Sequence, residues 1–165
     1  MISVKKVSHS MTNRRIFRTL SRDNCGESME PEDTEQIFFG FKQDNHDLKE
    51  MVVACASLKL ASKDCLDTTV GNFQHVVTFI FVHRDYKRQG IGKFLLSYLE
   101  VEAFNFLPRP IRVESARKAV GFFSKSGYIQ VGEPKETCAG SDLFRFLYTM
   151  EKNCPFLIEE ELWDT

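Results

Sequence analysis

Hydrophobic residues follow two spacings along this chain, and each change of spacing marks the boundary of an element. Alternation and runs of β-branched or aromatic residues predict strands, whereas apolar residues that recur every three or four positions predict helices. In chain order the predicted elements are a strand at 2–8, a helix at 11–22, strands at 36–42, 51–60 and 73–82, a helix at 89–104, a strand at 111–115, a helix at 116–127, and strands at 128–134 and 143–151. This order predicts a mixed α/β fold.

Three of these elements carry more specific expectations. Ile16, Phe17 and Leu20 would face inward from the first helix. The apolar run at 73–82 is typical of a strand that is covered on both faces. Gly127 would end the last helix in a left-handed conformation.

The composition is typical of a soluble globular protein, with 42% apolar and 27% charged residues in a chain of 165. No apolar run approaches the roughly 20 residues of a membrane span, and a net charge of −1 gives no field that would attract nucleic acid. No linker divides the chain, so we expect one domain over residues 1–150 and an acidic, apolar tail at 151–165. The five cysteines are irregularly spaced without a CxxC pair, which favours reduced thiols over a metal site or disulfides.

The start of the chain is basic, because its first 22 residues hold six Lys or Arg and no acid. Such a start is similar to a mitochondrial transit peptide. It also contains the first predicted strand and helix, which supply elements of the fold. We therefore expect a cytoplasmic or nuclear protein rather than a mitochondrial one.

The stretch VHRDYKRQGIGKFLLSYLE, residues 82–100, places a basic, glycine-containing turn between a predicted strand and a predicted helix. Backbone N–H groups at a helix start, beside cationic side chains, favour binding of phosphate. The Walker A pattern is absent, and the dinucleotide pattern GxGxxG fails because Leu95 stands where its third glycine would be. Gly90 and Gly92 would still let phosphate oxygens approach the backbone closely.

This turn resembles motif A of the GNAT superfamily, the acetyl-CoA-dependent N-acetyltransferases, in which the turn amides hold the CoA pyrophosphate. AVGFFSKSGY, residues 119–128, resembles motif B, whose helix packs beside the pantetheine and ends in glycine plus an aromatic residue. Lys87 occupies the first motif A position, where Arg or Gln is usual, and keeps a cation there. The resemblance covers roughly residues 1–150 and implies a central, mostly antiparallel sheet, splayed between its fourth and fifth strands, with helices on both faces.

The resemblance also implies acetyl-CoA as co-substrate and CoA as product. The strand before the turn would pair with pantetheine through its backbone, and the turn would hold the pyrophosphate. The motif B helix would flank the pantetheine or thioester, with ordinary core packing as the alternative. The residues assigned in this way are Ile80, Phe81 and Val82; Lys87, Arg88, Gln89, Gly90, Ile91, Gly92 and Lys93; and Ala119, Phe122 and Phe123.

Neither proton-transfer group familiar in this family is present. Many members have a tyrosine where this chain has Phe123, and histone-acetylating relatives have a glutamate where it has Val76. His75 and Glu114 are candidate catalytic residues, because an imidazole titrates near neutral pH and a partly buried carboxylate can act as a base. Strand alternation argues against His75, and a solvated charge is the alternative for Glu114. Backbone N–H groups of the strand at 73–82 would stabilise the oxyanion.

We therefore expect an N-acetyltransferase that moves acetyl from acetyl-CoA to a primary amine of a small molecule, peptide or protein, by direct attack in a ternary complex. The missing catalytic groups leave a second hypothesis open, a catalytically silent CoA-binding sensor or interaction module. The acceptor would lie against segments 12–35, 61–72 and 135–142, whose acidic residues would attract a cationic amine unless they are simply solvated. A monomer or homodimer is expected.

Overall fold

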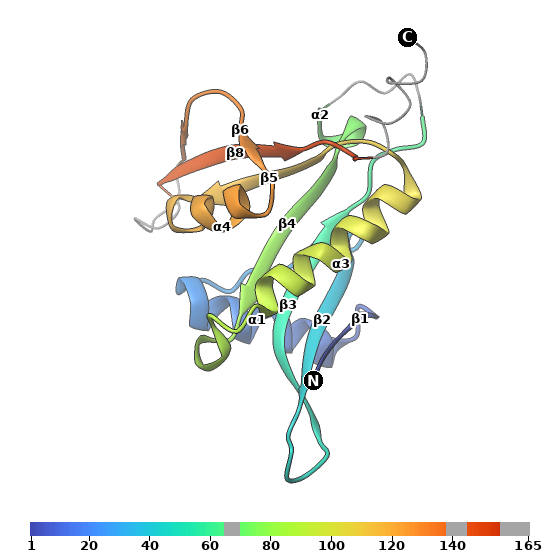
Figure 1. Ribbon diagram of the computed structural model, residues 1–165, viewed down its shortest axis with the longest axis vertical. Coiled ribbons are helices and arrows are strands. Elements are labelled where there is room, and N and C mark those ends of the chain that lie inside the picture. The colour runs from blue at the N-terminus through green and yellow to red at the C-terminus, as the bar shows by residue number, and fades with distance from the viewer. Residues whose placement is uncertain (65–69, 138–144, 156–165) are drawn as a thin grey trace. The chain divides into compact units, whose positions relative to one another are not determined.

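The computed structural model describes residues 1–64, 70–137 and 145–155. Its elements are β1 (Ile2–Val7), α1 (Met11–Cys25), β2 (Gln36–Gln43), β3 (Glu50–Lys59), α2 (Val70–Phe73), β4 (His75–Val82), the 3₁₀-helix η1 (Arg84–Tyr86), α3 (Ile91–Phe106), β5 (Ile111–Ala116), the 3₁₀-helix η2 (Arg117–Ala119), α4 (Val120–Lys125), β6 (Ile129–Gln130), β7 (Lys135–Glu136) and β8 (Phe146–Lys152). The predicted mixed α/β fold is confirmed (Figure 1).

The chain forms two compact units. The first unit comprises residues 1–59 and 77–102, and the second comprises residues 60–76 and 103–165 as far as they are described. Each unit is built from segments that are distant in the sequence, so neither is a continuous piece of chain. The expectation of a single domain over residues 1–150 stays a prediction.

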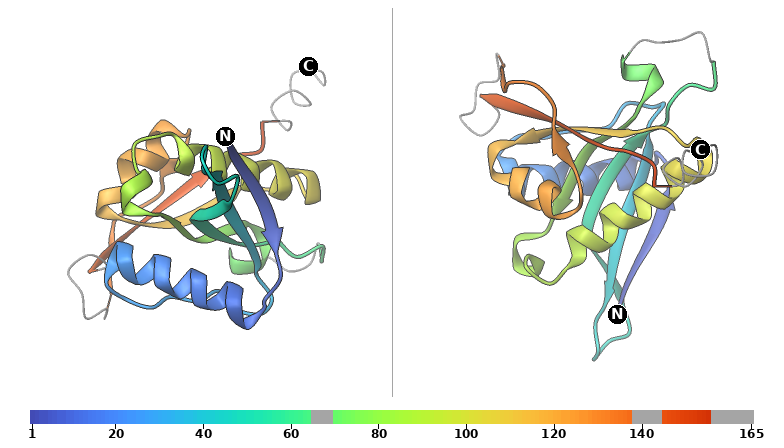
Figure 2. Two further views of the ribbon diagram at one scale, coloured as in Figure 1. Left: turned by 90° about the horizontal axis from the view of Figure 1, so that it is seen from below. Right: turned by 45° about the horizontal axis from the view of Figure 1, so that its top comes forward.

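The first unit is organised around a sheet in the strand order β1-β2-β3-β4. β1 pairs with β2 and β2 with β3, both antiparallel, so β2 and β3 form a hairpin. Gly40 lies at an irregularity of β2, where a Cβ atom would come within 3.2 Å of the Cβ of Ala54. The hairpin strands therefore approach more closely at Gly40 than a larger residue would allow. α1 covers one face of this sheet and α3 the other (Figures 1 and 2).

The face under α1 holds an aromatic core. Phe17 is fully buried and packs edge-on against Phe79 and Phe81, with ring centroids 6.1 and 6.2 Å apart. α1 begins directly after its N-cap, Ser10, whose side chain accepts the N–H of Asn13 and so fixes where the helix starts. Each buried Phe stabilises the fold by about 1.5–3 kcal/mol. The predicted inward face of the first helix is confirmed for its two buried members, Phe17 and Leu20; Ile16 is partly buried against the same core.

The opposite face of the sheet packs on α3. Phe38 of β2 is fully buried, and its ring lies edge-on to that of Tyr98, 5.9 Å away. Leu95 and Leu99 are also fully buried, which is the helical spacing that predicted this helix. Because both faces of the sheet are covered, its central strands carry the long apolar runs seen in the sequence.

The second unit contains β5, β8 and β6 in that order, with β7 also paired to β8, and all these pairings are antiparallel. The unit also holds α4, whose Phe123 contacts Tyr128 at 5.4 Å between ring centroids. Gly127 has a φ of +93°, so its predicted left-handed conformation is confirmed. The splay between β4 and β5 involves residues of both units and stays a prediction.

Some predicted elements are wrong in extent. No helix or strand was predicted at 61–72, yet this segment contains the start of α2. The helix expected at 116–127 divides into η2 and the shorter α4. The strand expected at 128–134 shrinks to β6, because Gly132 adopts a φ of +74° and Pro134 follows without an N–H to donate. Residues 143–144 of the last predicted strand lie outside the described residues.

Candidate functional site

The turn between β4 and α3 belongs to the first unit and is held by hydrogen bonds of His83. His83, directly after β4, donates its N–H to the carbonyl of Val53 at 2.7 Å. Its ring nitrogen Nδ1 accepts the N–H of Asp85 at 3.1 Å, and its carbonyl accepts the N–H of Tyr86 at 2.9 Å. His83 is therefore the cap of η1, a short helix that the sequence pattern did not predict.

The backbone after η1 adopts an uncommon conformation. Arg88 has a φ of +64° and Gly90 a φ of +78°. A Cβ atom on Gly90 would meet nothing within 4 Å, so glycine suits this position because of the backbone angle and not because of crowding. The carbonyl of Gly90 accepts the N–H of Phe94 at 3.0 Å, which starts α3. An L-residue with positive φ, such as Arg88, is uncommon and is often found at functional sites.

The helix start offers unpaired N–H groups, since the first turn of any α-helix lacks internal partners for them. Among the predicted phosphate-binding residues, Lys87, Arg88, Gln89, Gly90 and Lys93 are exposed, whereas Ile91 is buried and anchors the helix. The turn thus combines exposed backbone and cations at the positive end of the α3 dipole. This arrangement suits an anion.

Lys42 on β2 is a neighbour of the turn that the sequence did not reveal. Its Nζ donates to Oε1 of Gln89 at 3.0 Å and lies 5.1 Å from the ring centroid of Tyr86. With Oε1 engaged in this way, the amide NH₂ of Gln89 remains as the donor. No sequence motif could have identified Lys42, because 47 residues separate it from Gln89.

β4 departs from regular alternation at its centre. Ile37 pairs with Ser57 and Phe39 with Cys55, so Ser57 belongs to the face that α1 covers. The hydroxyl of Thr78 contacts that of Ser57, and the next residue, Phe79, packs in the aromatic core on the same face. Two consecutive side chains on one face indicate a β-bulge, which leaves local backbone groups outside the regular ladder.

The predicted pantetheine-binding residues of β4 follow this irregular point. Phe81 stacks on Phe79 with centroids 6.0 Å apart, so its side chain belongs to the core. Ile80 and Val82 are partly buried. The predicted role of all three requires only their backbone groups.

The predicted motif B residues lie in the second unit. Phe123 is 4% exposed and contacts Phe122 at 5.1 Å between ring centroids. Ala119 and Phe122 are partly buried. The contacts of Phe123 are those of core packing, the alternative considered for these residues.

The two predicted proton carriers also belong to the second unit. Glu114 receives hydrogen bonds from Arg112 and from the hydroxyl of Thr149, the latter at 2.8 Å, and its side chain is 32% exposed. His75 is fully buried, and each of its ring nitrogens has a backbone partner. Nδ1 accepts the N–H of Ala61 at 2.9 Å, so Nε2 donates to the carbonyl of Leu107 at 2.8 Å.

Burial lowers the pKa of His75, the hydrogen bond to Leu107 raises it and the charge of Arg109 lowers it further. The net effect favours a neutral imidazole. The ring is therefore held as a structural hydrogen-bonding group, and these contacts do not favour the predicted catalytic role.

Glu35 is a titratable residue that the sequence patterns did not single out. It lies in an acidic segment where solvated charge is the ordinary expectation, yet only 6% of it is exposed. Burial raises the pKa of its carboxyl, while hydrogen bonds from the backbone of Glu32 and from Thr78 lower it by less. No periodic signal in PEDTE distinguishes this glutamate from its solvated neighbours.

The family model for the acetyltransferase (GNAT) domain matches residues 39–148, which include the turn, β4 and α4. The chain belongs to the GNAT acetyltransferase family. The resemblance of motifs A and B is thereby confirmed at the level of the family. A search of curated proteins found no match.

Several solved structures of GNAT acetyltransferases share the fold. The ribosomal-protein-S18-alanine N-acetyltransferase of Escherichia coli matches with a TM-score of 0.68 at 14% identity, over 93% of this chain and 94% of that one. A GCN5-related N-acetyltransferase of Rhodopseudomonas palustris gives 0.64 at 16% identity, over 93% and 96%. A GNAT-family acetyltransferase of Staphylococcus aureus gives 0.62 at 13% identity, over 92% and 99%. At these identities the likeness shows the fold alone.

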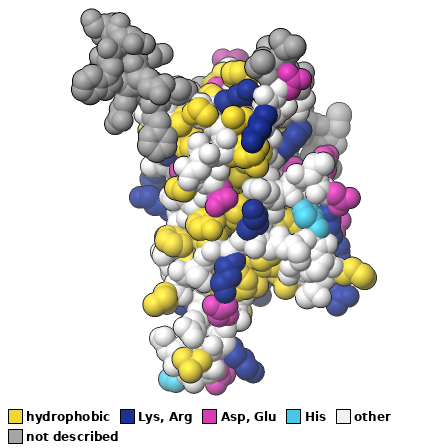
Figure 3. Space-filling model, turned by 90° about the vertical axis from the view of Figure 1, so that its right-hand side faces the viewer, with side chains coloured by type: hydrophobic (Ala, Val, Ile, Leu, Met, Phe, Trp, Pro, Cys, Tyr) yellow, Lys and Arg dark blue, Asp and Glu magenta, His cyan; other side chains and the backbone are white. Residues whose placement is uncertain are grey.

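Two further kinds of feature are absent from the described residues. No group of three or more His, Cys, Asp or Glu side chains there is arranged to hold a metal ion. No helix in the described part of the chain is long and apolar enough to cross a bilayer. On the face shown in Figure 3, Lys and Arg side chains are interspersed with Asp and Glu rather than gathered in one basic patch.

Proposed function

We propose that this protein transfers an acetyl group from acetyl-CoA to a primary amine, by direct attack of the amine on the thioester in a ternary complex. The observation that carries the proposal is the turn before α3, where Arg88 and Gly90 have positive φ at the positive end of a helix. This geometry, in a member of the GNAT family, suits the pyrophosphate of CoA.

The cofactor would be held mainly by backbone. The N–H groups of residues 88–93 would bind the pyrophosphate, and Lys87 and Lys93 would add positive charge. The bulged part of β4, with Ile80–Val82 after it, would pair with the pantetheine as a neighbouring strand does. Ala119, Phe122 and Phe123 remain the predicted flank of the pantetheine or thioester.

The chemistry requires a neutral amine, a stabilised oxyanion and a proton for the departing thiolate. An alkylamine is mostly protonated near neutral pH, so a group must accept its proton. Glu114 and His75 stay the candidates predicted from the sequence, and of the two only Glu114 is partly exposed. The acceptor is a small molecule, a peptide or a protein amine, and the protein acts in the cytoplasm or nucleus as a monomer or homodimer.

The test has a binding arm and a turnover arm. Purified full-length protein is titrated with CoA and followed by thermal shift, and thiol release from acetyl-CoA is then measured with spermidine, an alanine-initiated peptide and tryptamine. Binding together with turnover on any of these amines is the expected result. Binding without turnover would support the silent CoA sensor, and the absence of both would overturn the proposed function.

A further inference from the structure

Glu35 occupies a defined position on the face of the first unit that α1 covers. It immediately precedes β2, in which Ile37 pairs with Ser57 on this face. Glu35 is buried, and its side chain interacts with Thr78. The carboxyl group therefore lies near Thr78, whose hydroxyl contacts that of Ser57 at the point where β4 bulges.

Hydrogen bonds hold Glu35 in this position. Its Oε2 accepts the N–H of Glu32 at 2.9 Å, and its own N–H donates to the carbonyl of Glu32 at 3.0 Å. The Glu35 carbonyl accepts Nε2–H of His9 at 2.6 Å, and Arg14 donates to Nδ1 of the same ring at 2.8 Å. The side chain is thus oriented by the loop and by α1 before any ligand binds.

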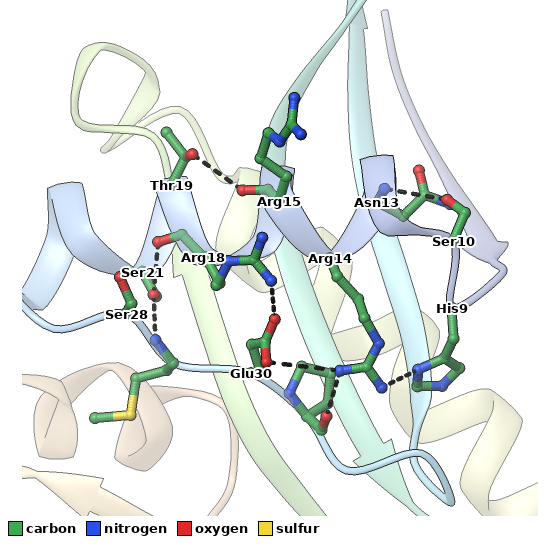
Figure 4. A network of polar contacts seen from close by, with 12 residues as sticks. His9, Ser10, Asn13, Arg14, Arg15, Arg18, Thr19, Ser21, Ser28 and Glu30 are labelled. Carbon is green, nitrogen blue, oxygen red and sulfur yellow. Dashed lines mark hydrogen bonds and ion pairs between the residues drawn. The ribbon is translucent and has the colours of Figure 1, made fainter.

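Arg14 ties the loop that carries Glu35 to α1. Its guanidinium also forms an ion pair with Glu30 (Figure 4). It further donates to the carbonyl of Pro31 at 3.2 Å and forms an ion pair with Asp33. Arg18 pairs with Glu30 as well. The guanidinium of Arg14 therefore pairs with carboxylates of the loop, and it forms no ion pair with the Glu35 carboxyl.

The hydroxyls of Ser57 and Thr78 connect this carboxyl to β4. Ser57 is fully buried, and its Oγ lies 2.5 Å from Oγ1 of Thr78. Thr78 in turn interacts with the Glu35 side chain, and this interaction lowers the pKa of the carboxyl. Since a hydroxyl both donates and accepts, Thr78 can pass a proton between Glu35 and a group bound at the bulge.

The charged groups that act on the Glu35 carboxyl are Glu32 from its own loop and Lys59 from β3. They oppose each other, and both have smaller effects than burial. His9 contacts the backbone carbonyl of Glu35 rather than its carboxyl, and Arg14 contacts the ring of His9. No described Lys or Arg forms a salt bridge with this carboxyl.

We propose that Glu35 is the proton acceptor for the attacking amine, with the Thr78 hydroxyl passing the proton between them. The proposal rests on the acetyl transfer proposed above, in which the pantetheine pairs with the bulged part of β4, and it places the thioester at that bulge. It gives a role to a buried carboxylate that forms no ion pair with a Lys or Arg of the described residues, and such groups cluster at functional sites. A burial-raised pKa also suits a base that works near neutral pH.

The proton transfer and the acyl transfer together conserve atoms and charge. The acceptor R–NH₃⁺ gives one proton through the Thr78 hydroxyl to the Glu35 carboxylate, which leaves R–NH₂ and a neutral carboxylic acid. The nitrogen attacks the thioester carbon, the C–N bond forms, the C–S bond breaks, and the electron pair leaves with sulfur. A second proton from nitrogen converts the thiolate to CoA–SH, and Glu35 returns its proton to solvent.

The test compares the pH dependence of kcat/KM for wild type and Glu35→Gln, using acetyl-CoA and the panel amine that the wild type acetylates fastest. A general base contributes about 10²- to 10⁴-fold, so a loss of at least about 100-fold is expected at neutral pH. The ratio of the two rates should shrink as pH rises, because solvent then deprotonates the amine without Glu35. A purely structural defect would leave that ratio independent of pH.

Three controls complete the design. Glu35→Gln should keep the CoA-induced thermal shift of the wild type, and Asp47→Asn, on the exposed β2–β3 turn, should keep its activity within about twofold. Thr78→Val removes the relay hydroxyl at similar volume and should lower kcat/KM by about 10-fold or more. If Glu35→Gln does not fold, the loss of activity in Thr78→Val still tests the proposal.

The outcomes separate the two proposals. Wild-type turnover with unchanged rates in Glu35→Gln and Thr78→Val would overturn the role of Glu35 and leave acetyl transfer intact. A pH-dependent loss in Glu114→Gln alone would assign the base to Glu114 instead. Absence of wild-type binding and turnover would overturn both proposals.

Discussion

The regions around His75 and Glu35 contain two buried titratable side chains that the fold treats differently. Burial is the largest cause of both pKa shifts, lowering that of His75 and raising that of Glu35, so both environments favour the neutral form. His75 has a backbone partner at each ring nitrogen. For Glu35, a backbone N–H among the described residues donates to Oε2, whereas none donates to Oε1.

The difference teaches how to separate structural from reactive polar groups. A buried group whose hydrogen-bonding capacity is filled by backbone serves the fold, because any reaction would break those bonds. A buried group that keeps an acceptor outside such backbone bonds, next to a side-chain hydroxyl, can exchange protons. Burial and a shifted pKa alone do not distinguish the two cases.

The largest expected effect comes from His75→Ala. It removes a buried ring and leaves the N–H of Ala61 and the carbonyl of Leu107 without their partner, so the free energy of unfolding should fall by about 3 kcal/mol or more. Urea unfolding measures this loss, with His46→Ala on the exposed β2–β3 turn as the control. Unchanged stability combined with lost turnover would break the comparison and make His75 reactive.

Gly90→Ala and Gly26→Ala form a matched pair within the first unit. The two glycines have nearly equal φ values, +78° and +79°, and a Cβ atom added to either would meet nothing within 4 Å. Each substitution should therefore cost about 1–2 kcal/mol of stability. Only Gly90→Ala should also weaken CoA binding, because only that backbone belongs to the turn. Isothermal titration with CoA checks this, and equal affinity in both variants would remove the turn from the site.

Lys42→Met tests a side chain that would act on the ligand through Gln89. It removes the hydrogen bond to Oε1 of Gln89 and a cation near the turn, so CoA should bind about 3- to 10-fold more weakly. Pantetheine, which has no phosphates, should bind as it does to the wild type. Lys49→Met, at an exposed position just before β3, serves as the control. An equal loss for CoA and pantetheine would contradict a phosphate-side role.

The smallest expected effect is on the pH dependence of folding stability, which should have opposite signs for Glu35 and His75. Because the pKa of Glu35 is raised in the folded state, its stabilising contribution is present below the unfolded pKa and is lost as pH rises through the folded pKa. Because the pKa of His75 is lowered, stability is lost as pH falls from the ordinary histidine value towards the folded one.

Glu35→Gln should therefore gain in Tm relative to wild type as pH increases, by a few degrees at most. Thermal melts between about pH 4 and pH 8 measure this difference. A gain that appears only at the acid end would contradict the raised pKa.

Much of the fold could be predicted because its elements have strong local patterns. Phe17 and Leu20 show helical spacing, and the run at 73–82 could be recognised as a doubly covered strand, which begins at His75. η1 and α2 were missed because each is a single turn, too short for periodicity to develop. The strand at 128–134 was overpredicted because apolar content alone does not reveal the positive φ of Gly132.

The residues of the candidate site also differ in whether a local sequence pattern could predict them. The turn at 87–93 could be predicted because its glycines and cations are consecutive in the sequence. Lys42 and Glu35 could not, because their importance arises from contacts with Gln89 and Thr78, which are more than 40 residues away. Neither a charge count nor a spacing rule encodes such contacts.

The contacts of Arg14 have a consequence for how an acceptor would associate. One guanidinium, that of Arg14, ties the segment from Glu30 to Asp33 to α1 at three residues, which restricts the conformations of this segment before a ligand binds. A ligand that docks against it would lose little loop entropy and would not wait for a closing motion. Recognition on this side of the first unit would then resemble docking onto a rigid surface, with selectivity set by shape and charge rather than by the folding of a flexible segment.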